Sequence, residues 1–216
     1  MPKITEAQRA TRRQQILDAA LRCFSRDGFH NTTTADIVRE SGVSQGTLYL
    51  YFKTKDEIIV ALADDRHQGE AFLSAMAQSA QDAIEGLALL LELHGQGLDD
   101  PRRADLRRVG IQGWAEALRN PTILASVTEG SSLVRQEIVR LVERGQRTGL
   151  IHAEVAPEAV ARVLIALFRG LTLEVSLGED AGLANVGPLV VDMIRGALFT
   201  DAARAAHPKL PLTSEE

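Results

Sequence analysis

Apolar side chains recur every three to four positions through most of the chain, which is the spacing of helices that bury one face. Near the N-terminus, Ile16, Ala20, Cys23 and Phe24 follow this spacing. They predict a helix that begins near residue 9, after a flexible arm formed by residues 1–8, and ends at Gly28. No stretch of useful length alternates apolar and polar residues, as a half-buried strand would. The pattern therefore predicts an all-α protein.

The segment after this first helix predicts two short helices joined by a tight turn. Thr33 or Thr34 can N-cap the first of them with a side-chain oxygen. Gly42 can then adopt the left-handed backbone that a sharp turn between helices needs. Ser44 can cap the second helix, 45–51. Two short helices joined by such a turn are typical of a helix-turn-helix, whose second helix usually enters a DNA groove.

The second short helix carries side chains that suit DNA. Gln45 can pair with an adenine edge, Thr47 can contact a thymine methyl or a phosphate, and Gly46 lets the backbone come close. The tyrosine hydroxyl and lysine ammonium groups that come after Thr47 in the sequence can bond to phosphate oxygens. The alternative is that these residues only decorate a small helical subdomain. The predicted DNA-contacting residues are Thr33, Thr34, Ser44, Gln45, Gly46, Thr47, Tyr49, Tyr51, Lys53 and Lys55.

The first quarter of the chain contains a series of residues and short motifs that are informative together: Ile16-Leu17-Asp18-Ala19-Ala20, Phe24, Gly28, Thr32-Thr33-Thr34, Ile37, Gly42-Val43-Ser44, Gly46-Thr47-Leu48-Tyr49, Tyr51-Phe52 and Lys53-Thr54-Lys55. On these residues the chain resembles the DNA-binding domain of the tetracycline-repressor (TetR) family of bacterial one-component regulators. Many members have histidine at the position of Tyr51. The resemblance implies an N-terminal three-helix helix-turn-helix domain, followed by a helical domain that binds a small-molecule effector and dimerises.

Composition and charge fit a DNA-binding protein once the charge is divided along the chain. Of 216 residues, 45% are hydrophobic and 25% charged, as in soluble globular proteins. The net charge is −5, but residues 1–55 hold nine Lys and Arg against five Asp and Glu, net +4, and the remainder is net −9. A basic N-terminal segment followed by an acidic remainder is the charge asymmetry expected of a protein with an N-terminal DNA-binding module.

Cys23 is the single cysteine, so no internal disulfide is possible. It lies on the apolar stripe of the first helix, and we interpret it as a core residue rather than a redox sensor. No signal peptide and no membrane-length apolar stretch is present. These features predict a cytoplasmic protein without a membrane partner, associated with the nucleoid when bound to DNA.

Capping signals and prolines predict the organisation of the rest of the chain. Thr54 and Glu57 form a capping-box pattern at the start of a helix that extends towards Met76. This helix would connect the DNA-binding segment to the rest of the protein. Asp100, Asn120 and Ala156 each precede a proline that suits the first helical position. Further helices are expected near 80–95, 101–118, 121–147, 157–178 and 187–200. The predicted domains are 1–55 for DNA binding, 56–207 for effector binding and dimerisation, and 208–216 as a flexible tail.

The last two long helices carry more apolar residues than one buried face requires. A symmetric partner subunit would cover the additional face, and in the resembled family these helices form a four-helix dimer interface. Burial of both helices wholly inside one subunit is the alternative. The predicted interface residues are Val163, Leu167, Leu171, Val190 and Ile194.

The effector pocket is the least defined feature of the sequence. Trp114 is the leading candidate, because it is the only tryptophan, although such residues are more often part of a core. Arg169 or Glu174, within an apolar run, could anchor a ligand or form an intersubunit pair. No cofactor and no metal are predicted, because no metal-ligand spacing of Cys and His occurs. The predicted ligand-binding residues are Trp114, Phe72, Met76, His94 and Phe168.

Together these patterns predict a repressor that binds a palindromic DNA operator as a homodimer and is released by a small-molecule effector. A transcriptional activator of the same fold is one alternative. An architectural DNA-binding protein without an effector is another. An all-helical enzyme is a third, but no phosphate-binding glycine loop or nucleophile motif specifies a reaction.

Overall fold

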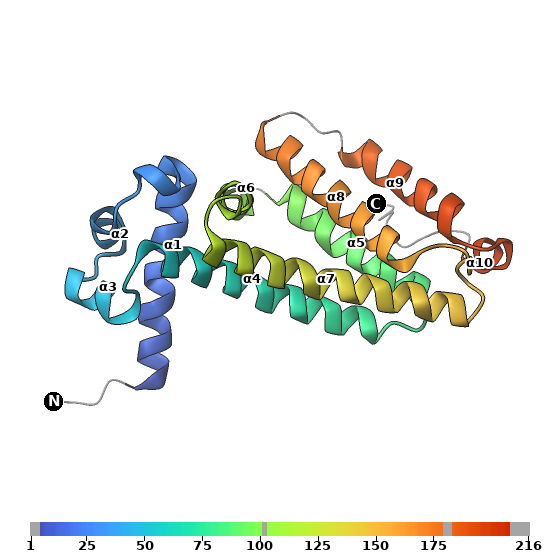
Figure 1. Cartoon of the computed structure of the whole chain (residues 1–216), viewed down its shortest axis with the longest axis horizontal. Coiled ribbons are helices and arrows are strands. Elements are labelled where there is room, and N and C mark those ends of the chain that lie inside the picture. The colour runs from blue at the N-terminus through green and yellow to red at the C-terminus, as the bar shows by residue number, and fades with distance from the viewer. Residues whose placement is uncertain (1–4, 101–102, 179–182, 208–216) are drawn as a thin grey trace. The chain divides into compact units, whose positions relative to one another are not determined.

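Helices form all the regular secondary structure in residues 5–100, 103–178 and 183–207, which the computed structural model describes. Side chains are described at most of these positions but not at 65–74, 93, 96, 97, 99, 183–185 and 187. The predicted all-α fold is confirmed. The helices are α1 (Glu6–Asn31), α2 (Thr34–Ser41), α3 (Gln45–Tyr51), α4 (Lys55–Gln78), α5 (Ala83–Asp99), α6 (Ala104–Ala117), α7 (Pro121–Arg147), α8 (Pro157–Ser176), α9 (Leu183–Leu198) and α10 (Asp201–Ala206) (Figure 1).

The chain packs as two compact units that interleave in sequence. The first unit combines Met1–His67 with Ala104–Glu129, and the second combines Gln68–Arg103 with Gly130–Glu216. The boundaries between the units lie within α4 and α7, so each of these two helices belongs partly to the first unit and partly to the second. The units do not follow a single boundary near residue 55, because α6 packs on α1. The functional division into 1–55 and 56–207 stays a prediction, and the tail 208–216 lies outside the described residues.

The core of the first unit lies where α1 meets α2, α3, the start of α4, and α6. Phe24 of α1 is fully buried and meets Phe29 edge to face, with ring centroids 4.9 Å apart. Leu48 anchors α3 in this core, and Cys23 is buried in it as predicted. Residues from later in the chain complete the core, among them Val109, Ala117 and Ile123.

A break in α1 is bridged by a side chain of α6. Gly28 has a φ of 81°, a conformation that glycine adopts without a Cβ clash, and it interrupts the helix. The Gln112 side chain donates from Nε2 to the Phe24 carbonyl at 2.9 Å, and its Oε1 accepts from the Phe29 N–H at 2.9 Å. The Ser25 hydroxyl also donates to Asp105 on α6, at 2.5 Å. These bonds join α6 to α1.

The capping predictions for α2 and α3 are confirmed, whereas the predicted start of α1 is wrong. Thr33, one of the two predicted candidates, caps α2, and Gly42 follows that helix in the left-handed conformation with a φ of 69°. Ser44 caps α3 as predicted. Helix α1 begins at Glu6, earlier than predicted, because Thr5 forms a capping box with Gln8. The proposed arm 1–8 is therefore wrong from residue 5 onward, and residues 1–4 lie outside the described part.

The start of α4 differs in one bond from the predicted capping box. The Thr54 hydroxyl accepts from the Glu57 N–H at 3.1 Å, as expected. The Glu57 carboxylate, however, accepts from the N–H of Lys53 at 2.6 Å instead of from that of Thr54. The reciprocal bond thus lies one residue earlier and ties the end of the helix-turn-helix to the start of α4.

The second unit contains α5, α8, α9 and α10 together with the later parts of α4 and α7, and its core includes Ile84, Leu87, Leu141, Val142 and Phe199. Helices α8 and α9 both contribute buried residues to this core, among them Val160 and Ile194. The only extended pairing in the described residues is an isolated bridge between Ile151 and Phe199.

Helix boundaries in this part of the chain follow the proline signals in two of four cases. Asn120 Oδ1 accepts from the N–H groups of Thr122 and Ile123 at the start of α7, and α8 begins at Pro157 after Ala156. The predicted start at residue 101 lies outside the described residues. The start near 187 is wrong, because Pro188 lies inside α9. Helix α10, capped by Thr200, was not predicted.

Candidate nucleic-acid interface

The ten predicted DNA-contacting residues lie on α3 and on the ends of its neighbours α2 and α4. Thr33 and Thr34 form the start of α2, Ser44 caps α3, and Lys55 begins α4. Gln45, Gly46 and Tyr49 are exposed, as are Thr33, Ser44 and Lys53. Thr34, Thr47, Tyr51 and Lys55 are half-buried. The structure thus distributes these residues over α3 and the adjoining ends of α2 and α4, and their contact with DNA stays a prediction.

Short-range bonds hold the hydroxyl groups of this region in fixed positions. The Ser44 hydroxyl accepts from the Thr47 N–H at 3.1 Å and lies 2.8 Å from the Thr47 hydroxyl. The hydroxyls of Thr34 and Tyr49 lie 3.3 Å apart and connect the start of α2 to α3. A surface whose polar groups are already positioned loses less conformational entropy when it binds.

The two lysines differ in their surroundings. Lys53 is exposed, and its Nζ donates to the Tyr49 carbonyl at the C-terminal end of α3, at 2.6 Å. Lys55 donates to the carbonyls of Phe29 and Thr32, the latter at 3.1 Å, where α1 ends. An ammonium group at a helix C-terminus satisfies carbonyls that lack intrahelical partners. Lys55 therefore has a structural role that sequence reasoning missed, and its predicted phosphate contact would be additional.

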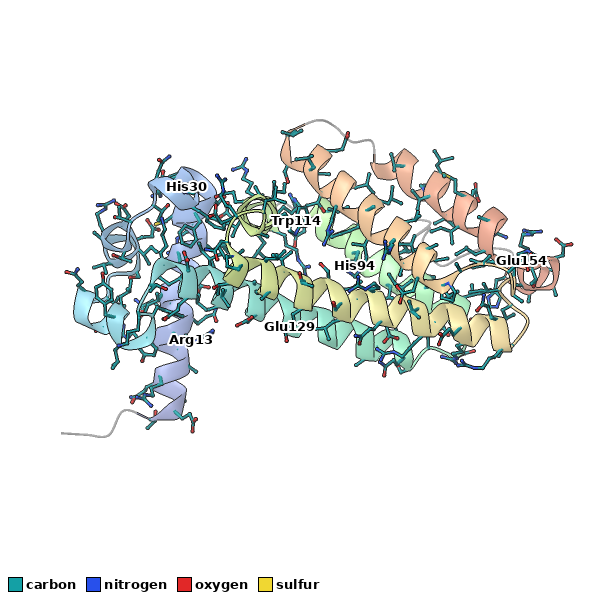
Figure 2. The ribbon with its side chains drawn as sticks, viewed as in Figure 1. Arg13, His30, His94, Trp114, Glu129 and Glu154 are labelled. Atoms are coloured by element: carbon teal, nitrogen blue, oxygen red, sulfur yellow. The ribbon has the colours of Figure 1, made fainter. Side chains whose placement is uncertain are left out.

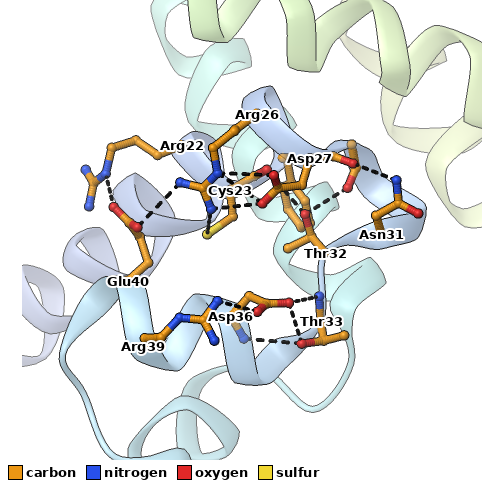
Figure 3. A network of polar contacts seen from close by, with 12 residues as sticks. Arg22, Cys23, Arg26, Asp27, Asn31, Thr32, Thr33, Asp36, Arg39 and Glu40 are labelled. Atoms are coloured by element: carbon orange, nitrogen blue, oxygen red, sulfur yellow. Dashed lines mark hydrogen bonds and ion pairs between the residues drawn. The ribbon is translucent and has the colours of Figure 1, made fainter.

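Ion pairs fix α2 against α1 on the side shown in Figure 3. Glu40 of α2 accepts from Arg22 Nε at 2.7 Å and lies 3.8 Å from Arg26, both on α1. The hydrogen bond from Arg22 lowers the pKa of Glu40. Arg26 also pairs with Asp27 at 2.8 Å. Burial and the nearby Glu40 carboxylate raise the pKa of the Cys23 thiol, so it stays protonated, in keeping with a core residue.

The capping box of α2 has a strongly stabilised carboxylate. Asp36 accepts from the Thr33 hydroxyl at 2.6 Å and from the Thr33 N–H at 2.9 Å. Arg39 donates to its other oxygen at 2.6 Å. These bonds, those from Thr33 foremost, lower the pKa of Asp36 from its usual 3.8 to about 2. The start of α2 is therefore held by an ionised side chain throughout the physiological range.

Leu50 is an exposed apolar residue on α3 that sequence reasoning did not single out. Its side chain is 60% exposed, whereas Leu48 is fully buried and Phe52 nearly so. The helical period could have revealed it, because a residue two positions from a buried one lies on the opposite side of a helix.

Of the predicted ligand-binding residues, the structure brings together His94 and Phe168. Their rings meet edge to face with centroids 5.0 Å apart, in the second unit. Met76 is exposed at the end of α4, and the Phe72 side chain lies outside the described residues. Trp114 is half-buried on α6, which belongs to the first unit (Figure 2). A ligand-binding role for these residues stays a prediction.

Glu137 is a buried carboxylate that sequence reasoning missed, because the apolar stripe of α7 continues on both sides of it. Its Oε2 accepts from Gln78 at 2.9 Å and from Arg140 at 2.5 Å. Its Oε1 is buried without a hydrogen-bond partner among the described groups. An unpaired buried acceptor is costly, and a bound donor would relieve that cost. Arg169, which sequence reasoning left open, donates to the Ser131 hydroxyl at 2.6 Å.

The predicted interface residues of α8 and α9 range from exposed to buried. Val163 is exposed, Leu167, Leu171 and Val190 are half-buried, and Ile194, at 8% exposure, belongs to the core of its own unit. Exposed apolar residues that the prediction omitted are Leu173, Leu177, Leu189 and Met193.

The described residues hold neither a membrane-spanning helix nor a cluster of metal ligands. No helix there combines the length and apolar character needed to cross a membrane. No group of three or more His, Cys, Asp and Glu side chains in the same residues is placed to hold a metal ion.

Comparison with known proteins places this geometry in a family. Residues 16–62 match the model of bacterial regulatory proteins of the tetR family, and residues 95–198 match that of the BetI-type transcriptional repressor C-terminal domain. The HTH-type transcriptional repressor Rv1474c of Mycobacterium tuberculosis is 29% identical over 90% of this chain and 99% of its own. The HTH-type transcriptional regulator UidR of Escherichia coli is 26% identical over 90% of this chain and 95% of its own.

Solved structures agree with these sequence matches. A transcriptional regulator from Saccharomonospora viridis, determined in complex with choline, superposes with a TM-score of 0.77 at 27% identity, over 88% of this chain and 99% of its own. The two family models cover the helix-turn-helix and most of the helical body, and the similar structures share both parts. The chain is a member of the TetR family of bacterial transcriptional regulators.

Proposed function

We propose that the protein is a transcriptional repressor that binds a palindromic DNA operator as a homodimer and is released by a small-molecule effector. The observation that carries the proposal is the orientation of α3. Its inner side is fixed in the core by Leu48, while Gln45, Gly46 and Tyr49 are exposed. A short helix that is anchored on one side and polar at its exposed N-terminal end suits the major groove.

Charge supports DNA as the partner. The first 55 residues carry a net charge of +4 in a chain whose net charge is −5. The exposed Lys53 lies beside the C-terminal end of α3, where an ammonium group can reach a phosphate. Phosphate contacts position the helix, and base contacts from Gln45 would supply sequence preference.

The exposed apolar residues of α8 and α9 support a symmetric dimer. Val163 and Met193 are each 65% exposed, and Leu177 and Leu189 are similarly accessible. Exposed apolar residues gathered on neighbouring helices are typical of an interaction surface, and the same surface on two copies gives a two-fold dimer. Such a dimer would present two copies of α3 to the two halves of a palindrome.

Release by an effector is supported by the relatives. A similar regulator was solved with choline bound, and another relative is named a repressor. For this chain, release requires an effector that binds more tightly to a conformation in which the two α3 helices no longer match the operator spacing. The unpaired Oε1 of Glu137 is a group that such a molecule could bind.

A footprint of the purified protein on the DNA upstream of its own gene tests the proposal. The expected result is protection of a site with two-fold symmetry, and loss of protection on Gln45→Ala. Gln14→Ala is the matched control, since Gln14 is exposed on α1 and bonds only to the neighbouring Asp18 in the described contacts. A compound screen for loss of the footprint then tests release. No protection of any DNA by the wild type would exclude the function.

The salt dependence of binding separates phosphate contacts from other effects. Lys53→Ala should reduce the slope of log affinity against log salt by about one, the contribution of one phosphate contact. Lys53 suits this test better than Lys55, because removing Lys55 would also leave the carbonyls of Phe29 and Thr32 without their donor. An unchanged slope would show that Lys53 does not contact phosphate.

A further inference from the structure

Leu50 contrasts with the polar residues around it on α3. It is 60% exposed, and its exposed neighbours Gln45 and Tyr49 carry polar groups. The apolar residues that stabilise the helix, Leu48 and the adjoining Phe52, lie in the core. Leu50 therefore contributes little to the packing of its own domain.

The helical period places Leu50 on the outermost line of α3. Successive residues are separated by about 100°, so Gly46 and Leu50 lie about 160° and 200° from the buried Leu48. They are four residues apart and share the side of the helix directly opposite the core. This is the side that comes closest to the bases when a helix anchored in this way enters a groove.

Gly46 leaves the surface beside Leu50 open. A Cβ built at Gly46 would have the Ser44 hydroxyl oxygen, at 4.0 Å, as its nearest neighbour outside the helix backbone. The Leu50 side chain leans towards the N-terminus of the helix, hence towards Gly46. The outer line of α3 thus consists of bare backbone followed by one apolar side chain.

We propose that Leu50 is a specificity residue that contacts the 5-methyl group of a thymine in the major groove, with Gly46 providing the clearance. The inference rests on the proposed binding of DNA by α3. Thymine is the base that presents an apolar group in the major groove, and an aliphatic side chain is its complement. Gln45 can read an adenine edge nearer the start of the helix, so the two residues would select A·T pairs at different positions of each half-site.

Replacement of thymine by deoxyuridine tests the proposal, because it removes only the methyl group. In the footprinted operator, each thymine of a half-site is replaced in turn, and affinity is measured for wild type and for Leu50→Ala. Wild type should lose about four-fold at one thymine, the value of one buried methyl group. Leu50→Ala should bind the natural operator more weakly and should not distinguish thymine from deoxyuridine at that position.

Leu118→Ala is the matched control, since Leu118 is 90% exposed and lies beyond the end of α6, outside α3. It should retain the wild-type response at every thymine. Circular dichroism should show Leu50→Ala folded, because the lost side chain is exposed. A wild type that ignores every substitution, or a Leu50→Ala variant with the wild-type response, overturns the role of Leu50. Absence of any wild-type footprint would instead overturn DNA binding itself, and this inference with it.

Discussion

Two side chains from distant parts of the sequence bond to backbone groups of α1 that lack helical partners, one at the break at Gly28 and one at the C-terminal end of the helix. Gln112 bonds to the carbonyl of Phe24 and to the N–H of Phe29. Lys55 donates to the carbonyls of Phe29 and Thr32. Unpaired buried backbone groups are costly, so these side chains stabilise a local conformation that the backbone alone would not hold.

Gln112→Ala should destabilise the protein by about 1–3 kcal/mol, because it leaves a donor and an acceptor near the core without partners. Urea denaturation measures the change. Gln14→Ala, which alters an exposed side chain of α1, should change stability by less than about 0.5 kcal/mol. Equal effects of the two substitutions would show that the Gln112 bonds do not stabilise the break.

Asp36 makes stability depend on pH in a defined window. Its pKa falls from 3.8 to about 2 in the folded protein, because Thr33 and Arg39 donate to the carboxylate. A lowered folded-state pKa gives a contribution that is present above about pH 4 and is lost as the pH falls towards 2. The difference in stability between wild type and Asp36→Asn should therefore shrink across this window. A constant difference would contradict the assigned bonds.

Glu137→Met should leave the protein as stable as wild type, or more stable by up to about 1 kcal/mol. The substitution removes a buried charge whose Oε1 is unpaired, and it leaves Arg140 mostly in water. Thermal denaturation measures the effect. A loss above about 1 kcal/mol would mean that the bonds from Gln78 and Arg140 outweigh the cost of burial.

At the scale of elements, local signals in the sequence predict the helix-turn-helix well. The hydroxyls of Thr33 and Ser44 cap α2 and α3, and Gly42 ends α2, because each acts on backbone within four residues of itself. Contacts between segments that are distant in the sequence have no comparable local sequence pattern that would predict them. The pairing of Lys55 with the end of α1 and of Gln112 with its break depends on tertiary packing, which the period of apolar residues does not encode.

The same limit explains the errors in the second unit. The apolar pattern of α9 correctly predicts a helix, but it does not separate Ile194, which lies in the core, from Met193, which is 65% exposed. A helix with apolar residues on several sides can be oriented only when its neighbours are known. The Gly187-Pro188 pair predicts a helix start, whereas Pro188 lies within α9.

Two glycines of the helix-turn-helix should respond oppositely to the same substitution. Gly42→Ala should destabilise by about 1–2 kcal/mol, because alanine is strained at a φ of 69° although space for a Cβ exists. Gly46→Ala should stabilise by about 0.5–1 kcal/mol, because Gly46 is helical and its surroundings are open. Gly46→Ala should nevertheless weaken operator binding, measured by gel shift, since its methyl group lies on the outermost line of α3. Undiminished binding would show that the backbone there does not approach DNA closely.

At the scale of the whole molecule, the exposed apolar residues of α8 and α9 predict how copies associate. Met193→Glu should convert the proposed dimer into monomers, because it introduces a charge into an apolar surface. Sedimentation velocity measures the change, and operator affinity should fall with it. Leu118→Glu, an equally drastic change at a residue that is 90% exposed, should leave the dimer intact. A Met193→Glu protein that remains dimeric would place the interface elsewhere.

The interleaving of the two units has a consequence for protein engineering. Consider a hybrid protein in which residues 1–67 of this chain are fused to the remaining part of another regulator. It would contain α1–α3 of this chain but the α6 of the other regulator. The positions of Val109, Gln112 and Ala117, which complete the core and bridge the break at Gly28, would then come from a sequence that did not evolve beside this α1. Successful grafts should transfer residues 104–129 together with the N-terminal segment.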